Sequence, residues 1–190
     1  MTTLLIGLAL WWAAHMMKRM APNLRRDLSA ALGERITRGL ISVFLLASVV
    51  LMFLGFRAAD FTPVYSPLPG MGYVNNILML FALFLTGVGP AGGRLSARWR
   101  HPMLWGVVVW AVAHLLVNGD LASVVLFGGL GLWAVVQVRL INSHEGPWQR
   151  PMPGNALQDW KLGLTTGFIY VVIAGIHWLF NHNPFLGTYP

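Results

Sequence analysis

Histidines are the residues of this chain best suited to chemistry. Four of the six lie inside or at the ends of apolar runs long enough to cross a membrane: His15, His101, His114 and His177. An ionisable side chain at membrane depth is costly, so each of these is a functional-site candidate. Neutral imidazole is a good ligand for iron or copper, and a bis-histidine haem needs facing imidazoles in an apolar slot. His144 and His182 are expected to be ordinary loop residues.

The segment around His114 offers the most complete set of groups. Trp110 and Asn118 lie four residues on either side of it and share its face of a helix, so they offer a ring to stack on and a hydrogen-bonding partner for the imidazole. His177 is expected at a similar depth near the outer surface, whereas His15 and His101 lie toward the other side. The alternative is that each histidine only bonds to a neighbouring helix.

Three other polar positions have both a functional and a structural interpretation. Arg100 and His101 precede Pro102, which suits the first turn of a helix, so they could hold an anion there or simply begin the helix. Arg57 could meet a haem propionate or an anionic substrate, or it could pair with Asp60. A third polar position, in the turn before the fifth apolar segment, is Asp120.

The composition is that of an integral membrane protein. Of the 190 residues, 56% are hydrophobic and 10% charged, and the mean hydropathy is +0.63. The excess of basic residues, 13 against 6 acidic ones, is typical of orientation signals, so no nucleic-acid partner is expected. The absence of cysteine excludes disulfides, thiol chemistry and iron–sulfur clusters. There is no Ser-His-Asp set, phosphate loop or carboxylate pair to support hydrolysis.

The apolar segments predict an all-α bundle of about six transmembrane helices, a single domain over residues 1–190 with no soluble domain. Each segment is near the ~20 residues that span a bilayer. Glycines in the last two segments are expected to let neighbouring helices approach closely: Gly128, Gly129, Gly131, Gly163, Gly167 and Gly175. The expected spans are about 2–19, 39–59, 74–92, 103–119, 121–140 and 161–182.

Basic residues concentrate in alternate connections, where 18–38, 93–102 and 139–161 hold 12 of the 13. The positive-inside rule then predicts a multi-pass protein of the inner (cytoplasmic) membrane with these connections in the cytoplasm and both termini outside. The 60–73 segment contains three prolines and two glycines, so it is expected to be an extended outer connection and a partial lid.

The fourth apolar segment resembles the NnrU family, whose relatives include 15-cis-ζ-carotene isomerase. The resemblance rests on His101-Pro102-Met103-Leu104-Trp105-Gly106 and on the stretch from Trp110 through His114 to Asp120, and it covers about residues 5–140. It implies a haem b within the bundle, with His15 and His114 as iron ligands and His177 as the rival that depth favours. Ala111 stands where the isomerase has a cysteine, so a thiolate switch is not expected.

The expected function is that of a haem b protein, either isomerase-like on a polyene or other lipophilic substrate or an accessory factor in nitrogen-oxide respiration (denitrification). One alternative is an isoprenylcysteine-type membrane methyltransferase, which the Arg-His-Pro sequence resembles, although Glu145 stands alone where that class has paired acids. The other is a non-enzymatic subunit that contacts a second membrane protein. The expected partners are the lipid bilayer and a lipophilic substrate or membrane protein.

Overall fold

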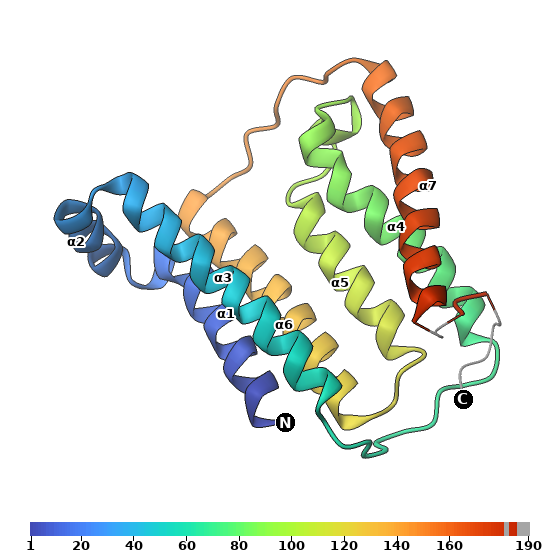
Figure 1. Cartoon of the computed structure of the whole chain (residues 1–190). Helices are drawn as coiled ribbons and strands as arrows, with labels where there is room; N and C mark the ends of the chain where they lie inside the picture. The colour runs from blue at the N-terminus through green and yellow to red at the C-terminus, as the bar shows by residue number, and fades with distance from the viewer. Residues whose placement is uncertain (181–182, 186–190) are drawn as a thin grey trace.

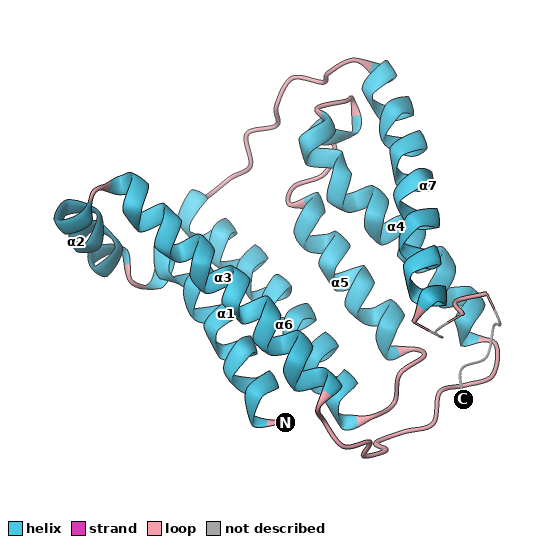
Figure 2. Cartoon of the chain, in the orientation of Figure 1, coloured by secondary structure: helices cyan, strands magenta, loops and turns pink. Residues whose placement is uncertain are grey.

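The computed structural model describes residues 1–180 and 183–185, so His182 lies outside the described residues. Within this part, the chain consists of helices and loops with one isolated bridge between Pro63 and Asp120 and no strand (Figure 2). The helices are α1 Thr2–Met20, α2 Pro22–Leu32, α3 Glu34–Arg57, α4 Met71–Ala91, the short 3-10 helix η1 Leu95–Ala97, α5 Pro102–Leu115, α6 Leu121–Glu145 and α7 Ala156–Leu179.

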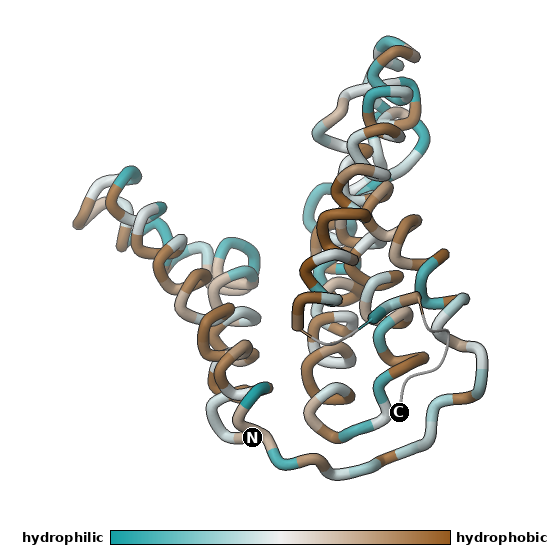
Figure 3. The backbone as a smooth tube through the Cα atoms, turned by 45° about the vertical axis from the view of Figure 1, so that its right-hand side comes forward, coloured by the Kyte–Doolittle hydropathy of each residue, from teal (hydrophilic) through white to brown (hydrophobic). Residues whose placement is uncertain are grey.

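Four of the helices in the described part are long and apolar enough to cross a membrane: α3, α4, α6 and α7. They correspond to the expected spans 39–59, 74–92, 121–140 and 161–182, although α3 and α7 begin about a turn earlier. The expected first span is helix α1, which at 19 residues is long enough but is not among the helices apolar enough to qualify, and the fourth is the 14-residue α5. Figure 3 shows that the residues along the middle of the helices are mostly hydrophobic. The chain is therefore a multi-pass helical membrane protein.

Helix α2 was missed by the sequence analysis, which treated 18–38 as a connection. Pro22 occupies its first turn, where the missing N–H costs nothing, and Gly33 ends it with a φ of 82°. The helix carries charged and apolar residues together, so it gives no membrane-length apolar signal. It lies at one end of the molecule beside α1 and α3 (Figure 1).

The helices form two groups that meet along one contact. Helices α1, α3 and α6 pack together, α4 packs against both α5 and α7, and the contact between α5 and α6 joins the groups (Figure 1). Helix α1 runs alongside α6 in parallel, since Leu4 packs near Ala122 and Trp12 donates its indole N–H to the Gly129 carbonyl at 3.2 Å. Helix α6 is thus the element that contacts the histidine-bearing helices α1 and α5.

Close packing of α1 on α3 depends on two glycines. A methyl group on Gly55 would lie 2.2 Å from the Leu4 nitrogen, and one on Gly7 would lie 2.7 Å from the Met52 nitrogen. Backbone approach of this kind is how helices associate in lipid. The sequence analysis placed such contacts in the last two spans instead. Gly129 does lie against Leu8 and Gly131 against Ala111. Among the described residues, nothing lies within 4 Å of a methyl group placed on Gly128, Gly163, Gly167 or Gly175.

The 60–70 segment is irregular, as its prolines predict, and it lies across the α5–α6 turn. The amides of Val64 and Tyr65 donate to the Gly119 carbonyl at 2.8 and 3.1 Å, and the Leu121 amide donates to Thr62. The Tyr65 hydroxyl donates to the carbonyls of Leu115 and Asn118. A side chain at position 119 would collide with the Tyr65 carbonyl. The loop is therefore fixed over the end of α5 that carries His114.

Candidate functional site

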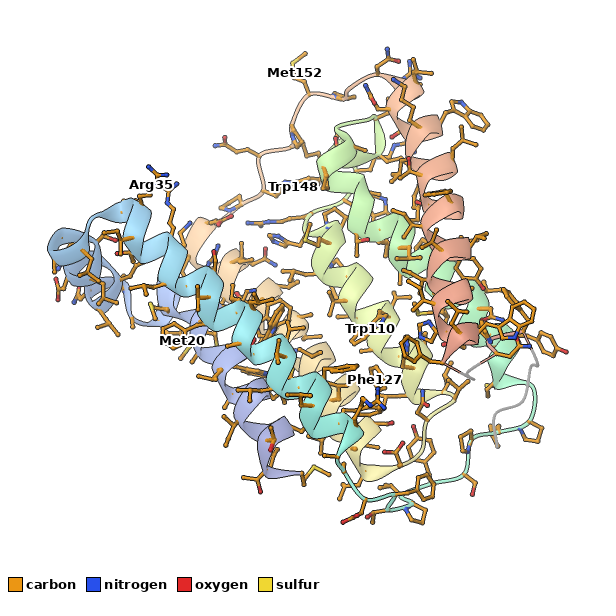
Figure 4. The ribbon with its side chains drawn as sticks, viewed as in Figure 1. Met20, Arg35, Trp110, Phe127, Trp148 and Met152 are labelled. Atoms are coloured by element: carbon orange, nitrogen blue, oxygen red, sulfur yellow. The ribbon has the colours of Figure 1, made fainter. Side chains whose placement is uncertain are left out.

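His114 lies in an aromatic cluster between α5 and α6. Its imidazole stacks on Phe127 with ring centroids 4.5 Å apart, and the Trp110 ring centroid lies 5.0 Å from that of each of these two rings. Trp110 and Phe127 are labelled in Figure 4. Phe56 of α3 meets the Phe127 ring edge to face, with ring centroids 6.3 Å apart. Nδ1 of His114 lies 2.9 Å from the Trp110 carbonyl. We call His114, Trp110, Phe127 and Phe56 the His114 cluster.

His15 lies in a second aromatic cluster between α1 and α6. Its ring lies 4.2 Å from Trp11 and 4.6 Å from Trp133, and the two indoles meet edge to face at 5.2 Å. Nδ1 of His15 lies 3.0 Å from the Trp11 carbonyl. We call His15, Trp11 and Trp133 the His15 cluster.

Both histidines make the same local contact, with the backbone carbonyl of a tryptophan four residues earlier. A carbonyl oxygen only accepts, so the short contact requires Nδ1 to carry the proton and donate it. The neutral ring then has its lone pair on Nε2, the atom that can bind a metal. No hydrogen bond to Nε2 of His15 or His114 is found in the described residues. The tautomer of both rings therefore suits ligation of iron.

Unsatisfied polar atoms distinguish the His15 cluster. The indole N–H groups of Trp11 and Trp133 are buried without a hydrogen-bond partner in the described structure, and so is Oε1 of Gln137. Gln137 follows Trp133 by one helical turn, so it lies on the same face of α6. A buried polar group without a partner costs free energy and calls for an explanation such as a missing ligand. These atoms fit a polar or metal-bearing group beside His15.

The structure does not join the two imidazoles. His15 contacts Trp133 and His114 contacts Phe127, six residues apart on α6, which is roughly 9 Å along the axis. No ring contact or hydrogen bond links them among the described residues. His177 is exposed on α7, and its Nδ1 donates to the Ile173 carbonyl at 2.8 Å.

Asn118 does not reach the imidazole. Its side-chain amide donates to the backbone carbonyl of His114 at 2.8 Å, and its backbone N–H donates to the same oxygen at 2.9 Å. Asn118 therefore satisfies the His114 carbonyl at the C-terminal end of α5 and fixes the backbone there. Ala111 lies on the same side of α5, which faces α6, and its methyl group lies close to Gly131 of that helix.

Arg100 and His101 hold the end of α6. The Arg100 guanidinium donates to the Gly146 carbonyl at 2.9 Å, and Nε2 of His101 lies 2.9 Å from the Asn142 side-chain oxygen. His101 is the N-cap residue of α5, as its position before Pro102 predicts, although it makes no side-chain cap bond. Glu145 pairs with Arg19 at 3.0 Å. These contacts give Arg100, His101 and Glu145 structural partners.

Arg57 and Asp120 also have local partners. The Arg57 guanidinium lies 5.8 Å from the ring centre of Phe53, one turn earlier on α3, and the described residues show no ion pair with Asp60. Asp120 is the N-cap of α6, where it accepts from the Ser123 amide at 3.0 Å. Neither residue touches a histidine cluster.

The residues that complete the two clusters were missed by the sequence analysis. Phe127, Trp133 and Gln137 belong to α6, and no spacing within the sequence relates them to a histidine on another helix. Trp11 could have been found, because Trp11 and His15 repeat the four-residue spacing of Trp110 and His114. Three or more His, Cys, Asp or Glu that could together hold a metal ion are not found in the described part. A one- or two-histidine site is what the described residues offer.

The fold and these clusters define a multi-pass helical membrane protein with histidines embedded among aromatic side chains at helix contacts. The NnrU protein family model matches residues 3–184, nearly the whole chain, and the chain belongs to that family. The resemblance noted over residues 5–140 thus extends through α7. Searches of the curated proteins and of the solved structures each returned no match.

Proposed function

We propose that this NnrU-family membrane protein binds haem b, with His114 as one axial ligand. The observation that supports the proposal best is the state of the His114 ring, which stacks on Phe127 and donates from Nδ1 to the Trp110 carbonyl. This arrangement directs the ligating lone pair to Nε2 within apolar, aromatic surroundings.

Two residues compete for the second axial position. His15 is favoured by the family resemblance, by the same Nδ1 contact and by the unsatisfied atoms of Trp11, Trp133 and Gln137 around it. His177 is favoured by its depth, since it and His114 both lie in the last turn of their helices. We propose His15 as the second ligand, with His177 as the alternative that the experiment distinguishes.

Haem would supply a redox-active iron with an exchangeable coordination position. Such an iron suits either isomerase-like chemistry on a lipophilic polyene or the role of an accessory factor in nitrogen-oxide respiration. The chain's own residues would hold the imidazoles in one tautomer, supply an apolar environment and restrict water. The 60–70 loop, which Tyr65 fastens over the end of α5, would limit entry beside His114.

The test is an ultraviolet–visible spectrum of the full chain purified in detergent with haem supplied during expression. We expect a Soret band and, on reduction, the α and β bands of a six-coordinate low-spin haem. His114→Ala is expected to abolish haem retention or convert it to a five-coordinate spectrum, and His15→Ala is expected to convert it. His144→Ala is the matched control, because His144 makes the same Nδ1 contact with the Leu140 carbonyl but lies exposed at the end of α6.

Each other outcome has a definite reading. A change with His177→Ala and none with His15→Ala would assign the second position to His177. Low-spin spectra that survive both His15→Ala and His114→Ala would overturn the ligand assignment. A folded but colourless protein that takes up no added haem would overturn the function and favour a non-enzymatic subunit.

A further inference from the structure

A basic hollow lies where the end of α1, helix α2 and the start of α3 meet. It has a volume of about 530 Å³. Its lining combines four cationic side chains with a single carboxylate: Lys18, Pro22, Arg25, Arg26, Ser29, Glu34 and Arg38. An excess of positive charge in one concave place attracts an anion.

Glu34 holds two of the arginines in place. Its carboxylate accepts from Nε of Arg38 at 2.8 Å, from the Ser29 hydroxyl at 2.8 Å and from an Arg25 guanidinium nitrogen at 3.3 Å. Each guanidinium has five N–H donors, so most of them stay available to a ligand. Glu34 is therefore a positioning residue, and phosphate is the anion that such forked donors suit.

Two further cations are less committed to partners. No ion pair of Lys18 is found in the described residues, and Arg26 has only a 4.0 Å contact with its neighbour Asp27, in which both side chains are largely exposed. A surface contact of that length contributes little. Lys18 and Arg26 are thus able to turn toward an anion in the hollow.

The position of the hollow favours a lipid as the source of the phosphate. Lys18 and Arg19 end α1, and α3 begins its membrane-length apolar stretch beyond Arg38, so the hollow lies at the level of the headgroups. Large apolar side chains are exposed around it, in particular Met20, Leu24 and Leu32. A short helix with basic and apolar residues between two bilayer-facing helices is typical of an interfacial segment.

We propose that this hollow binds the phosphate of an anionic glycerophospholipid, with the exposed apolar residues against its acyl chains. Arg25 and Arg38, oriented by Glu34, hold the phosphate oxygens, and Lys18 and Arg26 add charge at the rim. Lipid binding at this site does not require haem, so the experiment below tests it independently of the function proposed above. It lies on the side of the protein that the charge bias assigns to the cytoplasm.

The experiment is native mass spectrometry of the full chain in detergent, titrated with phosphatidylglycerol or with zwitterionic phosphatidylcholine of the same acyl chains. We expect phosphatidylglycerol to bind at least tenfold more tightly. The double variant Lys18→Gln/Arg26→Gln is expected to weaken that binding about thirtyfold, which corresponds to roughly 2 kcal/mol for the two basic residues removed. Arg98→Gln/Arg139→Gln is the matched control, because it removes the same charge from outside the hollow.

Glu34→Gln separates a built site from simple charge attraction. The variant adds positive charge, so attraction alone would strengthen phosphatidylglycerol binding, whereas loss of the orienting carboxylate is expected to weaken it. Stronger binding by Glu34→Gln, or equal losses in the two double variants, would overturn the proposal. Inorganic phosphate that displaces the lipid at a similar concentration would overturn the lipid assignment in favour of a soluble phosphate ligand. Circular dichroism of each variant checks that the helices are retained.

Discussion

The His15 and His114 clusters contain the same local hydrogen bond in two different surroundings. In each, a histidine donates from Nδ1 to the carbonyl of a tryptophan one turn earlier and packs against an aromatic residue of α6. The His114 ring stacks flat on Phe127, while Trp133 meets the His15 ring nearly edge-on. The local sequence therefore sets the tautomer, and the partner on α6 sets the environment.

The two clusters also differ in how well their polar groups are satisfied. Around His15, the indoles of Trp11 and Trp133 and the Gln137 amide oxygen are buried without partners. Around His114, Asn118 and the 60–70 loop satisfy the carbonyls at the end of α5. The backbone carbonyls around His114 therefore have partners, whereas the His15 cluster contains buried polar atoms without partners in the described structure.

Removing the stacking partner of His114 is expected to have the largest effect on stability. Phe127 is buried and contacts His114, Trp110 and Phe56, so Phe127→Ala should cost about 3 kcal/mol through lost packing. Thermal unfolding in detergent measures this cost. The comparison variant Leu132→Ala, at an exposed position of α6, should change the melting temperature little. Equal effects of the two variants would contradict the central place of Phe127.

Replacing the unsatisfied amide near His15 should have the opposite sign in the haem-free protein. Gln137→Leu removes a buried polar atom without a partner, so the haem-free chain is expected to gain about 1 kcal/mol of stability. If a ligand beside His15 uses that oxygen, the same variant should retain less haem. A loss of stability in the haem-free variant would show that Gln137 has a partner there.

The indole of Trp133 provides a finer probe of the same difference. Trp133→Phe keeps an aromatic edge near His15 but removes an N–H group that lacks a partner. We expect the haem-free protein to keep its stability to within about 1 kcal/mol, because the packing loss and the removed polar penalty offset each other. The Soret position should shift if the indole N–H contacts the bound group. Trp110→Phe is the matched variant in the His114 cluster and should leave the spectrum closer to wild type.

Loosening the loop over His114 should give a small effect that depends on pH. Tyr65→Phe removes hydroxyl bonds to the Leu115 and Asn118 carbonyls, at a cost of about 1 kcal/mol. Partial burial raises the pKa of Tyr65, with a further contribution from the Asp120 carboxylate. The stability that the neutral hydroxyl contributes is therefore complete below the ordinary tyrosine pKa of about 10 and is lost as the pH rises through the raised value.

The measurement is the difference in melting temperature between wild type and Tyr65→Phe as a function of pH. The difference should be present at neutral pH and should shrink in strong alkali, where the wild-type hydroxyl ionises. Tyr73→Phe, at an exposed tyrosine of α4, serves as the control and should show no such dependence. A difference that grows with pH would mean that ionised Tyr65 is stabilised in the loop.

Most of the helices could be predicted because membrane-length apolar runs report secondary structure directly. The runs identified α3, α4, α6 and α7 well, with end errors of about a turn where polar first turns such as Asn155 to Asp159 continue a helix out of the apolar region. Asp159 shows why, since its carboxylate accepts from the Arg94 and Leu95 amides and thereby holds the start of α7. Helix α2 was missed because its mixed charged and apolar residues give no such run.

The candidate site could be predicted only in part. The histidines and Trp110 were evident from their types and spacing, but Asn118 was assigned to the imidazole, whereas it bonds to the His114 carbonyl. Arg100, His101 and Asp120 serve helix ends. Their partners lie on other segments, or on the backbone, and neither is visible in a spacing.

The sequence by itself determined the membrane character and the helical class, because hydropathy over a run of residues is a local property. The tertiary structure alone decided that α6 contacts both histidine-bearing helices, that His15 and His114 meet different aromatic residues, and that basic residues of α1, α2 and α3 line one hollow. These features depend on packing between helices that are distant in the chain, and no local pattern encodes the register of such contacts.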